Sequence, residues 1–105
     1  QAPFRWWQRA RGARPALPVL AAHARYLHAL AIAQMSPPLP GRRPGARSLA
    51  VYLAHVTLGV SVHRLARVSG LTRKSIRRAI ATVEDHRDDV AYDAHVSTAE
   101  MRLIP

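Results

Sequence analysis

The sequence predicts an all-α fold, a small helical bundle within a single domain. Apolar residues recur at intervals of three and four through most of the chain, which is the helical period. No segment alternates apolar and polar residues as a half-buried strand does. The length of 105 residues suits one domain with a core large enough to fold unaided.

Residues 1–18 are interpreted as a basic, aromatic arm that precedes the bundle. They contain prolines and a glycine, show no sustained period, and place Phe4, Trp6 and Trp7 among four arginines. Such aromatic side chains can stack on nucleic-acid bases or fill a pocket of a protein partner. They can also fold back over the domain, because they bury a large area. The sequence leaves these alternatives open.

The first helix is predicted over residues 19–35, and Pro37 and Pro38 end it. Its recurring apolar residues are Leu20, Ala24, Leu27, Ala31 and Met35. The same helix carries His23 and His28, which raise the question of a metal site. Because no carboxylate or cysteine stands near them in the sequence, we expect neither a metal nor any other cofactor.

A loop is predicted over residues 37–45, because four prolines and two glycines exclude both helix and central strand. Arg42 and Arg43 stand at its centre. A second helix follows over residues 46–58, and Gly59 suits its C-terminal cap. This helix is expected to bury one face and to present two residues at the rim of the bundle. The buried face is Leu49, Ala50, Leu53 and Val56, and the rim residues are Tyr52 and His55.

Two short helices joined by a tight turn are predicted next. Ser61 is the expected N-cap of residues 62–68, and Thr72 is that of residues 73–83. Ala66 is small where two steeply crossing helices must approach, and Gly70 tolerates the positive φ that the turn requires. The residues spaced for a shared core are Leu65, Leu71, Ile76, Ala79 and Ile80. Together these features predict a helix-turn-helix over residues 62–81.

The end of the chain is predicted to be a polar, acidic stretch with at most one further helical turn. Beyond Glu84 the sequence is polar and acidic as far as Asp93. A final helical turn, opened by Ser97 or Thr98, is expected to carry Met101, Leu103 and Ile104. The chain therefore divides into the arm at 1–18, a helical domain at 19–95 and a tail at 96–105.

Charge is distributed unevenly within the net +10. Residues 1–83 hold 14 basic residues and no acid, hence +14, whereas residues 84–105 hold two basic residues and six acids, hence −4. A basic body of this kind predicts a polyanionic partner, and the acidic end is expected to keep DNA away from the face that meets proteins.

Several protein classes are excluded or disfavoured by composition. The chain has no cysteine, which excludes disulfides, thiolate metal sites and a cysteine nucleophile. Since the first 83 residues offer no carboxylate to orient a base or donate a proton, we expect no enzyme. No apolar run approaches the ~20 residues of a membrane span, so no membrane partner is expected.

The outer face of the second helix of the helix-turn-helix carries the predicted DNA contacts. In this motif such positions enter the major groove, where arginine can hold a guanine with two hydrogen bonds. We expect the basic loop and the start of the following helix to bind phosphates or the adjacent minor groove. The predicted DNA-binding residues are Arg42, Arg43, Arg47, Ser61, Thr72, Arg73, Lys74, Ser75, Arg77 and Arg78.

Two runs of residues carry a resemblance to a known family. The run Ala-Arg-Ser-Leu-Ala-Val-Tyr-Leu-Ala at 46–54 and the run Leu-Gly-Val-Ser-Val-His-Arg-Leu-Ala at 58–66 are similar to segments of the C-terminal DNA-binding domain (domain IV) of the bacterial replication initiator DnaA. The resemblance extends from Arg42 to Glu84. It implies a helical domain in which a basic loop, here with Arg42, Arg43 and Arg47, places arginine in the minor groove.

The chain also departs from that family. Where the family reads the initiator box with Gly-Gly-Arg-Asp-His-Thr-Thr, residues 69–75 are the shorter match Ser-Gly-Leu-Thr-Arg-Lys-Ser and lack both Asp and His. This argues against recognition of the replication-origin box. A Gly-x-x-x-x-Gly-Lys loop is absent, so ATP-driven melting of an origin is not expected.

Small proteins with such a domain include GafY-type activators of alphaproteobacterial gene transfer agents, which this Arg- and Ala-rich chain resembles more loosely. The resemblance implies a promoter-binding activator that works with RNA polymerase or with a co-activator that binds the polymerase. We therefore expect a sequence-specific, double-stranded DNA-binding transcription regulator, cytoplasmic and associated with the nucleoid.

Three other functions remain open at this point. They are a helical adaptor that docks an acidic protein, an RNA-binding protein that uses the arginine-rich arm, and a replication-associated binder of origin DNA. The oligomeric state is also open, because no heptad pattern or obvious dimer helix is present.

Overall fold

The computed structural model describes residues 17–37 and 39–104 of the chain. Over these residues the chain forms five α-helices and no strand, which confirms the prediction of an all-α fold. The aromatic residues predicted to belong to the N-terminal arm lie outside the described residues. The helices are α1 (Leu17–Met35), α2 (Ala46–Tyr52), α3 (Val62–Ser69), α4 (Arg73–His86) and α5 (Val90–Leu103).

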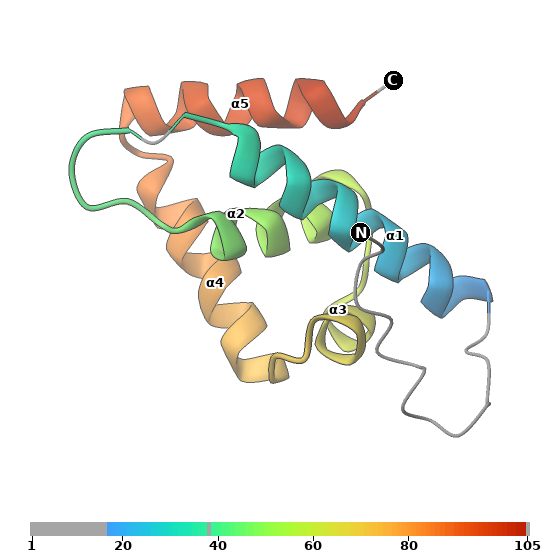
Figure 1. Ribbon diagram of the computed structural model, residues 1–105. Helices are drawn as coiled ribbons and strands as arrows, with labels where there is room; N and C mark the ends of the chain where they lie inside the picture. The colour runs from blue at the N-terminus through green and yellow to red at the C-terminus, as the bar shows by residue number, and fades with distance from the viewer. Residues whose placement is uncertain (1–16, 38, 105) are drawn as a thin grey trace.

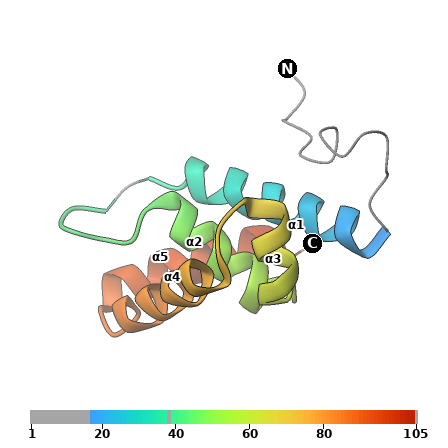
Figure 2. The same cartoon turned by 90° about the horizontal axis from the view of Figure 1, so that it is seen from below.

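Helix α2 lies at the centre of the bundle and packs against both α1 and α4 (Figure 1). Helix α1 crosses the molecule and also contacts α3 and α5, and the view from below shows α3 beside α1 (Figure 2). The core lies where these helices meet. Its largest fully buried side chains are Val51, Leu53, Leu65, Ile76, Val83, Tyr92 and Val96. None of the described helices is both long enough and apolar enough to cross a membrane.

Helix α1 ends where the sequence predicts but begins earlier. It begins at Leu17, two residues early, because the first turn tolerates Pro18. The apolar residues whose spacing indicated the helix do not form its buried face, since Ala24, Ala31 and Met35 are exposed. The buried residues are Ala22, His23, Tyr26, Ala29 and Ala33. Alanine suits either side of a helix, and the bulk of Tyr26 decides which side faces the core.

The second helix changes its winding after Tyr52. The following residues form the π-helical segment η2 (Leu53–Thr57), in which the Leu58 N–H donates to the Leu53 carbonyl oxygen at 3.1 Å. A π turn takes more residues per turn than an α turn, so the buried face shifts. The predicted face is therefore wrong at Val56, which is 47% exposed. Gly59 ends the segment with φ +72°, as its cap position predicts.

The rim position predicted for Tyr52 is also wrong, because this side chain is buried. Its hydroxyl accepts a hydrogen bond from Arg87 Nη1 at 3.0 Å, which satisfies the polar end of the ring inside the bundle. His55 is half-buried, and its Nδ1–H donates to the Val60 carbonyl oxygen at 2.8 Å.

The largest correction concerns the end of the chain. Helix α5 runs over 14 residues, beginning at Val90 rather than at Ser97 or Thr98. Asp89 caps it, accepting hydrogen bonds from the N–H groups of Ala91 and Tyr92. The helix buries Tyr92, Val96, Ala99 and Leu103, which follow one another at three- and four-residue steps. The boundary expected between residues 95 and 96 therefore falls inside α5.

Candidate nucleic-acid interface

Helices α3 and α4 are joined by a short turn, and each helix has the N-cap that the sequence predicts. The Ser61 hydroxyl oxygen accepts from the Arg64 N–H at 3.2 Å, and the Thr72 hydroxyl oxygen accepts from the Ser75 N–H at 3.1 Å. Gly70 ends α3 in the left-handed region at φ +78°. These features set where α3 begins and ends and where α4 begins.

Helix α4 has two distinct faces. Ile76 and Val83 are fully buried, and the half-buried Ala79 and Ile80 pack against the same core. This confirms the apolar face predicted for the helix. Arg77 and Arg78, which follow Ile76 directly, are turned away from the core by the 3.6-residue period. All six predicted contact positions of this segment are exposed: Thr72, Arg73, Lys74, Ser75, Arg77 and Arg78.

The part of α3 and α4 that flanks their connecting turn carries positive charge and no acid. Residues 61–78 hold six basic residues and no acidic residue. Among the described residues, the carboxylates of Asp89, Asp93 and Glu100 pair with Arg43 or Arg87 and not with the cations at the start of α4. Neither α3 nor α4 has an acid in its first turn, where the helix dipole favours negative charge. Both helix starts are therefore electrostatically suited to an anion.

Two of the predicted contact hydroxyls also hold the start of α4 together. Thr72 Oγ1 donates to Ser75 Oγ at 3.0 Å while it accepts from the Ser75 N–H. The only hydrogen of the Thr72 hydroxyl is thus used within the cap. Ser75 Oγ accepts in this contact and keeps its own hydrogen. Of the two, Ser75 is the residue with a donor left for a base or a phosphate.

The side chain of Arg73, the first residue of α4, contacts α3. Its Nη2 lies 2.7 Å from Nδ1 of His63, in the first turn of α3. Both side chains are exposed. His63, Arg64 and Arg67 were not among the residues predicted from the sequence to contact DNA. Their spacing, which places them on one side of a short helix, is the signal that could have indicated them.

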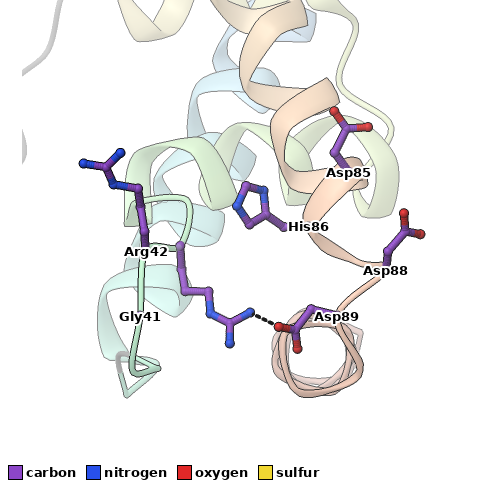
Figure 3. A pocket seen from close by; sticks show the side chains of 7 residues that line it. Gly41, Arg42, Asp85, His86, Asp88 and Asp89 are labelled. Atoms are coloured by element: carbon purple, nitrogen blue, oxygen red, sulfur yellow. Dashed lines mark hydrogen bonds and ion pairs between the residues drawn. The ribbon is translucent and has the colours of Figure 1, made fainter.

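The three predicted loop contacts differ from one another in the structure. Arg43 pairs through Nη1 with Asp89 Oδ2 and donates from Nε to the Pro40 carbonyl oxygen. Arg42 is exposed, and its side chain extends away from Asp85 and Asp88 (Figure 3). Arg47 is exposed in the first turn of α2. Arg42 and Arg47 are therefore accessible, whereas Arg43 already has an acidic partner.

The basic loop and the start of α4 lie at different ends of that helix. Figure 1 shows α4 running from its first turn beside α3 to the corner where α5 begins. Arg43 reaches Asp89 at that corner, whereas Arg73 opens α4. At 1.5 Å per residue, α4 separates the two ends by about 20 Å. A surface that uses both regions spans more than one groove of a DNA duplex.

A cleft of about 550 Å³ separates the loop from the α4–α5 corner (Figure 3). Gly41, Arg42 and Arg43 line one side of it, and the other side is formed by Asp85, His86, Asp88 and Asp89. The Arg43 guanidinium and the N–H groups of the α5 start hold the pKa of Asp89 below its ordinary value. The carboxylate facing Arg43 therefore stays ionised well into the acidic range.

Arg87 is a structural hub that sequence reasoning missed. Its Nε donates to Asp93 Oδ1 at 2.6 Å and its Nη1 to Glu100 Oε1 at 3.2 Å, besides the bond to Tyr52. Burial disfavours its charge, but the hydrogen bonds of Asp93 and Tyr52 together raise the pKa of Arg87. Three of the six acids are thus bound by arginines, namely Asp89, Asp93 and Glu100. The acidic end holds the bundle together as well as carrying charge.

The described residues contain no cluster of three or more His, Cys, Asp or Glu side chains suited to a metal ion. The two histidines of α1 have different environments, since His23 is buried and His28 is exposed. Burial lowers the pKa of His23 and favours its neutral form.

Comparison of the chain with protein-family models, curated proteins and solved structures found no match.

Proposed function

We propose that this protein is a sequence-specific, double-stranded DNA-binding transcription regulator in which α3 and α4 act as a helix-turn-helix. The observation that carries the proposal is the outward face of α4. It presents four cations and two hydroxyl residues at exposed positions, while Ile76 anchors the opposite face in the core. Exposed arginines and hydroxyls at the start of a helix are the groups that read base edges in the major groove.

The charges of this face favour binding to a phosphate-rich partner and argue against a basic face that is only exposed to solvent. Cations in the first turn of a helix oppose the helix dipole, at a cost of about 0.3–1 kcal/mol each. Arg73 and Lys74 occupy that turn in α4, and no described acid offsets them. Phosphates provide the missing negative charge and release counterions on binding.

Arg42 and Arg47 are proposed to contact phosphates or the neighbouring minor groove, and Ser61 a phosphate near the start of α3. On the resemblance to DnaA domain IV and to gene transfer agent activators, the proposed biological role is a promoter-binding activator. Its proposed partner, besides DNA, is RNA polymerase or a polymerase-binding co-activator.

Selection of bound duplexes from random and genomic fragments, followed by affinity measurements on the selected sequence, tests this proposal. We expect a recurring DNA sequence, bound more tightly than a scrambled duplex of the same composition. The logarithm of affinity should fall with the logarithm of salt concentration by about 0.9 per phosphate contact. Failure to enrich any sequence, together with salt-insensitive or absent binding, would contradict the proposal.

A further inference from the structure

The contact between Arg73 and His63 restricts the chemistry of both side chains. An arginine guanidinium only donates hydrogen bonds. In a hydrogen bond of 2.7 Å between Arg73 Nη2 and His63 Nδ1, the ring nitrogen is therefore the acceptor. His63 must then be neutral, with its proton on Nε2.

This hydrogen bond gives Arg73 an orientation that packing does not supply. Arg73 is the first residue of α4 and is exposed, so its long side chain has many rotamers of similar energy. The ring of His63 adds an acceptor fixed on the neighbouring helix. Its backbone position is itself set by the Ser61 cap, two residues earlier in the chain.

We infer that His63 is a positioning residue that holds Arg73 in the orientation used to read DNA. The inference rests on the proposed function, because it assigns a role within the same α3–α4 surface. The side chain of Arg73 then loses its conformational entropy in the free protein and not on DNA binding. This favours binding to duplexes that have a hydrogen-bond acceptor at the position of the guanidinium. His63 thereby acts on sequence discrimination through Arg73 rather than by a base contact of its own.

Two substitutions separate positioning from a direct contact. His63→Asn retains an acceptor near the place of Nδ1 but removes Nε2–H, whereas His63→Ala removes both. Neither changes the charge of a neutral histidine. The measured quantity is discrimination, the ratio of affinities for the selected duplex and for a scrambled duplex. We expect His63→Ala to lower discrimination about fivefold, the value of one hydrogen bond of about 1 kcal/mol.

The same pair of substitutions is then made in an Arg73→Ala background. If His63 acts through Arg73, His63→Ala has no further effect on discrimination there, and His63→Asn stays within about twofold of the parent when Arg73 is present. Equal losses from His63→Ala in both backgrounds would overturn the inference. A loss in His63→Asn as large as in His63→Ala would also overturn it, since it would indicate a contact made by Nε2–H.

A measurement on the free protein keeps this inference separate from the proposed function. Imidazole nitrogen NMR of the DNA-free chain should show neutral His63 with its proton on Nε2. The resonance of the unprotonated Nδ1 should shift in Arg73→Ala, because the hydrogen bond from the guanidinium is lost. A His63 protonated at Nδ1 in the free protein would contradict the inference even if DNA binding is strong. Absence of DNA binding by the parent would instead overturn the proposed function and, with it, the role assigned to His63.

Discussion

Arg43 and Asp89 form an ion pair across 46 residues of sequence, joining the proline-rich loop to the start of α5. Asp89 caps that helix at the same time, through the N–H groups of Ala91 and Tyr92. The basic loop is therefore attached to the acidic corner of the bundle. A phosphate that binds Arg43 must compete with this carboxylate.

Asp89→Asn should raise the affinity for DNA, because asparagine keeps the helix cap but releases Arg43. Asp88→Asn is the matched control, since it removes the same charge from the neighbouring residue. Among the described residues, the Asp88 carboxylate has no hydrogen-bonding partner. Salt-dependent binding curves should show an extra slope of about 0.9 for Asp89→Asn relative to Asp88→Asn. Identical curves for the two variants would show that Arg43 gains no phosphate.

Acid should destabilise the fold partly through Asp89. Its folded-state pKa lies below the ordinary value of 3.8, so its contribution to stability is complete above that value and is lost as pH falls through the lowered pKa. Denaturant unfolding at a series of pH values below about 5 should show a loss of stability that is smaller in Asp89→Asn. A parent and variant with parallel pH profiles would be inconsistent with the lowered pKa.

Two buried tyrosines should respond differently to loss of the hydroxyl. Burial raises the pKa of Tyr92 to about 12, and its hydroxyl has no hydrogen-bond partner among the described residues. Tyr92→Phe should therefore be neutral or stabilising, whereas Tyr52→Phe should cost about 1 kcal/mol because it removes the acceptor of Arg87. Free energies of unfolding for the two variants provide the comparison. A larger loss in Tyr92→Phe than in Tyr52→Phe would reverse this assignment.

Gly70→Ala should destabilise the protein by about 1–2 kcal/mol, because φ is +78° at this position. The space around the residue is open, so the cost comes from the backbone alone. Gly45→Ser is the control, since φ at Gly45 is −72°, nothing lies within 4 Å of an added Cβ, and serine is favourable at this N-cap position. Thermal unfolding should separate the two variants, and equal melting temperatures would argue against the left-handed turn.

Local rules were sufficient for the α3–α4 segment. Ser61, Gly70 and Thr72 each act on backbone groups a few residues away, so their positions alone specify the caps and the turn. The fully buried Ile76 is likewise specified by helical spacing. Whether the outward face binds DNA depends on a partner, and the sequence supports that only as a prediction.

Long-range contacts account for what the sequence did not predict. The extent of helix α5 was not predicted, because acidic residues of this kind are typical of a solvent-exposed tail. In the structure Asp93 and Glu100 bind Arg87 across the α4–α5 corner. The burial of Tyr52 depends on the same arginine, which stands 35 residues away. The pairing of Arg43 with Asp89 also joins distant segments and changes how one predicted DNA contact is presented.

The central claim is that the outward face of α4 binds DNA, and the comparison of Arg77→Ala with Arg102→Ala tests it most directly. Both variants remove one exposed arginine, but Arg77 lies on α4 and Arg102 lies near the end of α5. Affinity for the selected duplex should fall about tenfold in Arg77→Ala, as for a lost contact of ~1–3 kcal/mol, and stay close to the parent value in Arg102→Ala. Equal affinities in the two variants would contradict the claim.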